Sequence, residues 1–178
     1  TAASCGVKRF NLVSLIIYRQ LNPKIKMEEY DKLLKEAIRH LQIADHMTYV
    51  TLPLINENRL LLKIFDEICL SIIKSINSIL SYEHFCKRIN LYTNYSNNLE
   101  TFVRIAKNYD ISNEQLRKIK EIININNQHK QSAVEFVKRD RVVIMSDNLG
   151  TQILDIRIIK QYLLFVKELL VKTSRGIK

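Results

Sequence analysis

Residues that break a regular backbone are almost absent from this chain. There is no glycine between Gly6 and Gly150, and Pro23 and Pro53 are the only prolines. Folds rich in strands or loops use glycine and proline at turns, bulges and edge strands, so the chain favours long helices. With 178 residues, 47% of them hydrophobic, it is long enough to enclose one core, and we expect a single domain.

Positive charge is concentrated at the N-terminus. Residues 1–26 contain five Lys or Arg and no Asp or Glu, so they hold half of the net charge of +10 and leave +5 for the rest. Met27 is followed by EEYDKLLKEA, which is typical of a protein start. We therefore divide the chain into a basic segment, 1–26, and a domain, 27–178. Three origins of the segment stay open: expression-derived or upstream sequence, a targeting peptide around FNLVSLIIY, or a nucleic-acid-binding arm.

Two long helices are predicted in the first half of the domain. From Tyr30 to Thr48, apolar or small side chains recur at spacings of three and four, which predicts a helix that ends near Pro53. Residues 54–82 carry a wider apolar stripe. It consists of Leu61, Phe65, Ile68, Ile72, Ile76 and Ile79, with Ile64, Cys69, Ile73 and Leu80 beside them. A stripe of this width indicates a central helix that is buried on more than one side.

Three further helices are predicted in the second half. The sequence RINLYTNYSNN indicates a break near Ser96, followed by a short helix to Tyr109. Ser112 and Gln115 match a capping box, which opens a helix that we expect to run to about Lys138. The last helix has a seam for packing against its neighbours. The seam is formed by Ile156, Ile159, Leu163, Val166 and Leu170.

These elements predict an all-α fold, an antiparallel bundle of four long helices plus a shorter one. One segment departs from the helical pattern. Residues 142–145, VVIM, prefer an extended conformation, and Ser146, Asp147, Asn148 and Gly150 supply a turn before the last helix. We expect the rest of the domain to be helical.

Cysteine usage and hydropathy bear on the compartment. The three cysteines are odd in number and have no metal-binding spacing, which fits a reduced, cytoplasmic environment. Cys69 is predicted to be a small core residue. Lys and Arg interrupt every apolar run before it reaches the roughly 20 residues that span a bilayer, so no transmembrane segment is expected. His40 and His46 point to different sides of a helix, and no cofactor motif is present, so we expect neither metal nor cofactor.

Two polar residues interrupt the apolar seam of the helix that begins near Ser112. The seam runs through Leu116, Ile119 and either Ile122 or Ile123, then reaches Asn126 and His129 before it continues to Ala133 and Phe136. A buried polar group without a partner costs roughly 1–3 kcal/mol, so both side chains need one. Either they form a structural polar network, or they line a site in which His129 can transfer a proton.

The first half of the domain resembles the HEPN family of nucleotide- and RNA-associated helical proteins. The resemblance rests on LLKEAIRHLQIADH and NRLLLKIFDEI within residues 28–82. Members that cut RNA carry an Arg, a polar residue, about four others and a His on a late helix. Asn124 and His129 match the polar residue and the His, but Ile123 stands where the Arg belongs. The resemblance implies a helical bundle that binds RNA or a nucleotide without strong catalysis.

Basic residues follow directly after the polar interruption. Lys138, Arg139 and Arg141 would either cap the end of the helix in solvent or form a basic lip over a groove that contains Asn126 and His129. In the second case the five residues form one site for an anionic ligand or RNA phosphate.

Three functions stay open at this stage. The first is RNA or nucleotide binding, for which affinity falls steeply with salt. The second is a protein-interaction or homodimerisation module without a nucleic-acid role. The third is a ribonuclease that uses His129 as its general base.

Overall fold

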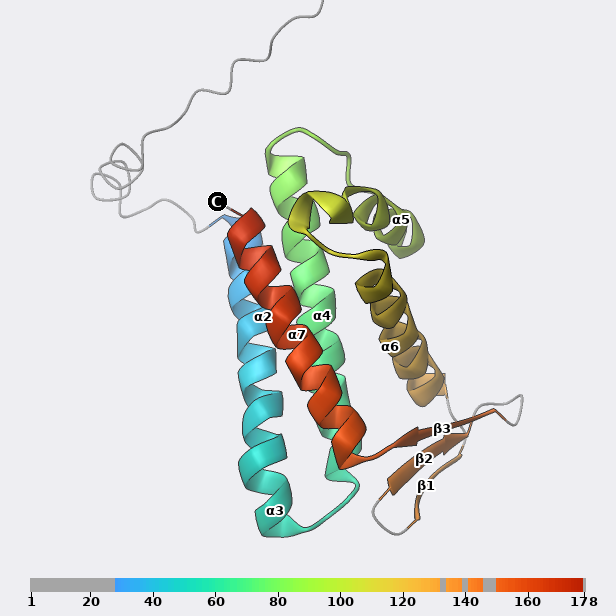
Figure 1. The fold of residues 1–178 in the computed structure, drawn as a ribbon. Helices are drawn as coiled ribbons and strands as arrows, with labels where there is room; N and C mark the ends of the chain where they lie inside the picture. The colour runs from blue at the N-terminus through green and yellow to red at the C-terminus, as the bar shows by residue number, and fades with distance from the viewer. Residues whose placement is uncertain (1–27, 132–133, 139–140, 146–149, 178) are drawn as a thin grey trace, which may run out of the picture.

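The computed structural model describes residues 28–131, 134–138, 141–145 and 150–177, apart from the side chains of Val134, Glu135 and Lys138. The basic segment 1–26 lies outside the described residues. The long helices are α2 (Glu29–His46), α4 (Leu60–Phe85), α6 (Asn113–Gln131) and α7 (Ile156–Gly176). Consecutive long helices run in opposite directions, and α7 lies against both α2 and α4 (Figure 1). The predicted helical bundle is confirmed.

The helix α4 is the centre of the bundle, as its wide apolar stripe predicts. It packs against α2 on one side, α7 on another and α6 on a third. All six residues of the main stripe are buried, and Cys69 is buried among them, which confirms its assignment to the core. Burial raises the pKa of the Cys69 thiol well above its ordinary value.

The first helical segment ends near Pro53, as predicted, at Ile55. After α2 the chain forms a π-helix, Met47–Thr51, and the short helix α3, Leu52–Ile55, before Asn56 adopts a left-handed conformation. Pro53 lies in the first turn of α3, where its missing N–H costs little, so it does not end the segment. The next helix therefore begins at Leu60 instead of residue 54.

The shorter helix and the capping box are found where they were predicted. The helix α5 spans Tyr95–Ile105 and continues as a 3₁₀ turn, Ala106–Tyr109. Ser112 Oγ accepts a hydrogen bond from the Gln115 N–H at 3.2 Å, and Gln115 Oε1 accepts one from the Ser112 N–H at 3.1 Å. This reciprocal pair starts α6.

A three-stranded antiparallel sheet lies between α6 and α7, and only its middle strand was predicted. The strands β1 (Val134–Lys138), β2 (Arg141–Met145) and β3 (Thr151–Leu154) are arranged in the order β1-β2-β3. The prediction that α6 runs to Lys138 was wrong, because the helix ends at Gln131. Residues 134–138 pair with β2 instead, and Phe136, which was expected to continue the core seam, is 40% exposed.

The sheet covers one end of the bundle core. Val142 and Ile144 of β2 and Leu154 of β3 are buried in the core, while Val143 belongs to the other face of β2. Asp155 then caps α7 by accepting a hydrogen bond from the Ile158 N–H at 2.9 Å. Within the described part of the chain, none of the helices combines the length and the apolar character needed to cross a bilayer.

Candidate functional site

The two polar residues on α6 have different surroundings. Asn126 is 2% exposed, and its Oδ1 atom has no hydrogen-bond partner among the described residues. His129, one turn further on, is partly buried, and its Nε2 atom lies 3.6 Å from Asp66 Oδ1 of α4. The burial of Asn126 was predicted correctly. That the two side chains share a polar network, or line one site, stays a prediction.

The His129–Asp66 pair alone is a weak basis for catalysis. A carboxylate beside an imidazole can orient it as a base. Cleavage of RNA also needs a group that stabilises charge on the phosphate. Ile123, where the predicted resemblance would require an Arg, is buried in the core and cannot supply that charge.

Two of the three basic residues after α6 belong to paired strands. Lys138 ends β1 and pairs in register with Arg141, the first residue of β2, and Arg139 lies outside the described residues. Arg141 is exposed. The strand β1 carries this end of the hairpin roughly 13 Å along the sheet, away from the end of α6 (Figure 1). Neither of the two pockets described below is lined by any of the five residues, and their grouping into one site stays a prediction.

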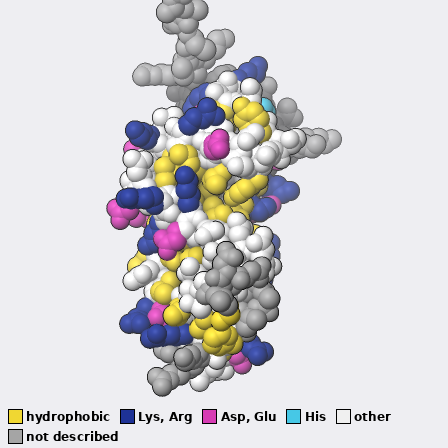
Figure 2. All heavy atoms as spheres, turned by 90° about the vertical axis from the view of Figure 1, so that its right-hand side faces the viewer, with side chains coloured by type: hydrophobic (Ala, Val, Ile, Leu, Met, Phe, Trp, Pro, Cys, Tyr) yellow, Lys and Arg dark blue, Asp and Glu magenta, His cyan; other side chains and the backbone are white. Residues whose placement is uncertain are grey.

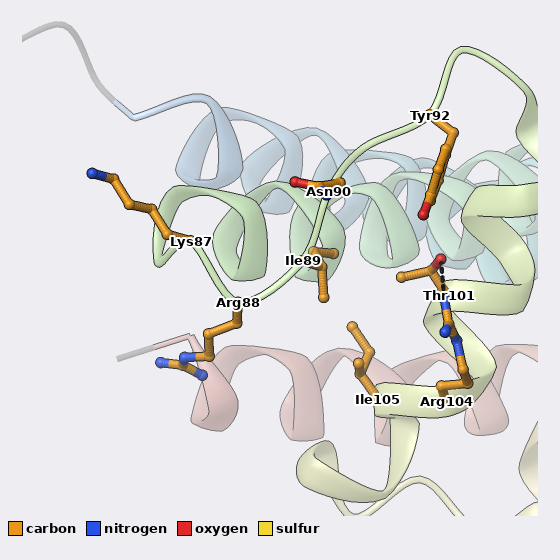
Figure 3. Close-up of a pocket in the computed structure, with 8 residues that line it drawn as sticks. All are labelled: Lys87, Arg88, Ile89, Asn90, Tyr92, Thr101, Arg104 and Ile105. Carbon is orange, nitrogen blue, oxygen red and sulfur yellow. Dashed lines mark hydrogen bonds between the residues drawn. The ribbon is translucent and has the colours of Figure 1, made fainter. Parts of the chain in front are cut away.

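A basic pocket, which was not predicted from the sequence, lies between the end of α4 and α5. It has a volume of about 390 Å³ and is lined by Lys87, Arg88, Ile89, Asn90, Tyr92, Thr101, Arg104 and Ile105. Three of these residues are cations, and within the described part of the chain no Asp or Glu lines the pocket. Ile89 and Ile105 face each other between its two ends, with Lys87 and Arg88 at one end and Tyr92 and Arg104 at the other (Figure 3).

The C-terminus of α4 positions the two cations at one end of the pocket. The Arg88 N–H donates to the Glu83 carbonyl at 2.9 Å and the Lys87 N–H donates to the His84 carbonyl at 2.8 Å. These two bonds form a Schellman motif. Its left-handed position, usually glycine, is occupied by Lys87 with a φ of 59°. A lysine there is strained, and it extends outward from the end of the pocket (Figure 3).

A buried carboxylate holds the second cation at this end. Glu83 Oε1 lies 3.0 Å from Arg88 Nη1 and also accepts a hydrogen bond of 2.7 Å from the Tyr109 hydroxyl. The Tyr109 ring in turn lies against Gly176 at the end of α7, where a Cβ atom would come within 2.3 Å of the ring. Through Glu83 and Tyr109, Arg88 is therefore connected to α4, to the 3₁₀ turn after α5 and to the end of α7.

The opposite end of the pocket combines an aromatic ring with a guanidinium. Tyr92 and Arg104 point toward each other across Thr101 (Figure 3), and Arg104 Nη2 donates to Thr101 Oγ1 at 3.0 Å. Exposed apolar side chains surround this region of the chain: Phe85, Leu91, Tyr92 and Tyr95. The face that carries α5 and α6 likewise shows hydrophobic side chains gathered between Lys and Arg side chains (Figure 2).

A local signal for this pocket was present in the sequence. Residues 87–107 contain Lys87, Arg88, Arg104 and Lys107 against the single acidic residue Glu100, and Tyr92 and Tyr95 stand between them. Cations interleaved with aromatic residues are typical of surfaces that bind single-stranded nucleic acid. What the sequence did not show is that the chain folds back to place Arg104 opposite Arg88.

The second pocket is a weaker candidate for a binding site. It has a volume of about 370 Å³ and is lined by Ser112, Glu114, Gln115, Lys118, Phe165, Glu168 and Lys172. Its principal polar groups bind one another: Lys172 Nζ donates to Gln115 Oε1 at 2.8 Å, and Gln115 Nε2 donates to Glu168 Oε1 at 2.8 Å. Among the described residues there is also no group of three or more His, Cys, Asp or Glu that could hold a metal ion.

Comparisons of this chain with protein-family models, curated proteins and solved structures found no match. The resemblance to HEPN proteins therefore stays a prediction. The α4–α5 pocket is the candidate site on the strength of its own geometry.

Proposed function

We propose that this protein binds RNA through the pocket between α4 and α5, without strong catalysis. The proposal rests on one observation. Lys87, Arg88 and Arg104 line one open pocket, and no described carboxylate lines it. Lys and Arg contacts to phosphate supply most of the affinity of proteins for nucleic acid. A guanidinium offers a planar fork of donors that matches phosphate oxygens.

The shape of the pocket suits a nucleotide chain better than an isolated anion. Its two cationic ends are separated by Ile89 and Ile105, which form an apolar floor (Figure 3). A ribose or a base can lie on such a floor while phosphates on either side meet the cations. The volume of about 390 Å³ also falls in the range of roughly 300–1,000 Å³ that is usual for small-ligand sites.

The test uses a double variant, Lys87→Gln with Arg104→Gln, and a fluorescent single-stranded RNA 10-mer. Arg88 is left unchanged because its removal would leave the buried Glu83 carboxylate without its ion-pair partner. We expect the double variant to bind about 10- to 100-fold more weakly at low salt, and the slope of log affinity against log salt to flatten by about 1.4 for two lost contacts.

A matched control removes the same charges from a nearby helix. Arg117 and Lys120 are exposed on α6 and line neither described pocket. Replacing both with Gln should leave the affinity within about threefold, because only general electrostatic attraction changes. Equal weakening in both double variants would show that binding depends on net charge and not on the pocket. No binding by the parent protein at low salt would end the proposal.

The β-hairpin is tested in the same titration. The triple variant Lys138→Gln, Arg139→Gln and Arg141→Gln addresses the basic residues first predicted to contact RNA. If the pocket is the site, this variant should behave like the α6 control. A loss of RNA affinity that is confined to the hairpin variant would move the proposed RNA site from the pocket to the sheet.

A second candidate function, binding of a partner protein or a second copy, is favoured by the opposite end of the bundle. Tyr49, Val50, Leu54 and Ile55 expose apolar side chains on consecutive helical turns, and Leu54 is 80% exposed. Clusters of this kind often mark protein interfaces. Sedimentation over a hundredfold range of concentration tests it: a mass that rises in the parent but not in a Leu54→Gln, Ile55→Gln variant supports self-association.

A further inference from the structure

The Tyr92 ring at one end of the basic pocket is exposed, and the backbone that carries it is anchored. Its side chain is 47% exposed. The side-chain amide of Asn98 holds the backbone of the same residue from both sides: Asn98 Oδ1 accepts from the Tyr92 N–H at 2.9 Å, and Asn98 Nδ2 donates to the Tyr92 carbonyl at 2.8 Å. A loop residue is thereby anchored to the first turns of α5.

This anchoring distinguishes Tyr92 from an ordinary exposed aromatic residue. The N-cap of α5, Asn94, also accepts a hydrogen bond from the Ser96 N–H at 2.9 Å, so the loop is held at two successive points. A ring whose backbone is already ordered loses less conformational freedom when it stacks on a ligand. Arg104, which points toward the ring, can meet a phosphate of the same strand (Figure 3).

We infer that Tyr92 is a stacking platform for an unpaired base, and that the pocket therefore takes single-stranded RNA in preference to duplex RNA. Asn98 is a positioning residue, because it acts on the base only through Tyr92. The inference rests on the proposed function and deepens it. In a duplex the faces of the bases are occupied by their neighbours, so the ring finds nothing to stack on except at the ends.

The experiment compares three probes of equal length: a single-stranded RNA 10-mer, a 10-mer of the same backbone without bases, and a 10-base-pair duplex. The abasic strand keeps the phosphates and removes the stacking partners. We expect the parent protein to bind the base-carrying strand about 10-fold more tightly than the abasic strand, which corresponds to one stacked base. Duplex RNA should bind more weakly than the base-carrying strand, because its bases are not free to stack on Tyr92.

Three substitutions isolate the ring. Tyr92→Leu should lower the ratio of the affinities for the base-carrying and the abasic strand to about 2. Tyr92→Phe keeps the aromatic face and should retain most of the preference for the base-carrying strand. The matched control is Tyr49→Leu, since Tyr49 is 50% exposed at the other end of the bundle. It should leave the ratio unchanged. A ratio that is unaffected by Tyr92→Leu would overturn the inference.

Asn98→Ala tests the positioning role. It should lower the ratio between the base-carrying and abasic strands while leaving the affinity for the abasic strand within about twofold, because the cations are untouched. A merely structural role would weaken both strands equally. If the parent binds both single strands equally well, the stacking inference fails while RNA binding stands; if it binds neither, the proposed function itself fails.

Discussion

Tyr109 donates its hydroxyl to the buried carboxylate of Glu83 over 2.7 Å, and this bond connects residues 26 positions apart in the chain. Burial, and then the hydrogen bond to the carboxylate, raise the pKa of Tyr109 far above its ordinary value. The hydroxyl therefore stays protonated and remains a donor throughout the neutral range. Through Glu83 the same bond supports Arg88 at the edge of the basic pocket.

Replacing Tyr109 with Phe should destabilise the protein by about 1.5–3 kcal/mol, the usual contribution of a hydrogen bond to a charged group. The ring remains to pack against Gly176, so the loss reports the hydroxyl alone. Urea unfolding at pH 7 measures it. Tyr49→Phe is the control, because Tyr49 is exposed. A loss below about 0.5 kcal/mol would show that solvent replaces the bond to Glu83.

Replacing Asp155 with Ala should cost about 1 kcal/mol at pH 7, because it removes the N-cap of α7. The backbone hydrogen bond from Ile158, followed by the interaction with Arg157, holds the pKa of Asp155 below its ordinary value despite burial. A depressed folded-state pKa gives stability that is complete above the unfolded-state pKa and is lost as the pH falls through the folded-state value. The difference between parent and variant should therefore shrink below about pH 4.

Urea unfolding at several pH values checks the Asp155 prediction. Asp45→Ala is the control, because Asp45 forms only a partly exposed pair with Lys167. Such pairs contribute about 0–1 kcal/mol. A stability difference at Asp155 that persists undiminished to pH 3 would contradict the role of its ionised carboxylate.

Replacing Lys87 with Gly should stabilise the fold and weaken RNA binding. Glycine relieves the left-handed strain at this position, and after allowance for its more flexible unfolded state we expect a gain of about 0.5–1 kcal/mol. Loss of one cation should flatten the salt slope by about 0.7. Thermal melts and RNA titrations measure the two effects.

Asn56→Gly is the matched control for Lys87→Gly. Asn56 is also left-handed, with a φ of 53°, but it ends α3, which lies at the other end of the bundle from α5 (Figure 1). Its substitution should leave RNA affinity unchanged. Unchanged binding in Lys87→Gly as well would remove Lys87 from the proposed site.

Replacing Asn126 with Leu should stabilise the protein by about 1–2 kcal/mol, because it removes a buried carbonyl oxygen that lacks a partner. RNA affinity should not change, since Asn126 does not line the α4–α5 pocket. Paired unfolding and binding measurements check both expectations. Destabilisation, or weaker RNA binding, would favour the earlier hypothesis that Asn126 lines a site near the end of α6.

Periodic and short-range signals in the sequence determined most of the bundle. The stripe from Leu61 to Ile79 predicted a central helix, because side chains three and four residues apart share one face whatever the helix packs against. The capping box of Ser112 and Gln115 predicted where α6 begins, since both of its hydrogen bonds lie within four consecutive residues. The burial of Asn126 followed from the same periodicity.

Tertiary structure alone decided where α6 ends and where the basic pocket lies. Phe136 continues the helical spacing of Ile122 and Asn126, but residues 134–138 gain hydrogen bonds by pairing with β2, which no spacing within α6 reveals. Likewise, the cations of the pocket come from both sides of the α4–α5 loop, and Arg104 faces its end of the pocket only after the chain turns back. Contacts between distant residues depend on the whole packed arrangement, whereas helical periodicity depends only on the residues that carry it.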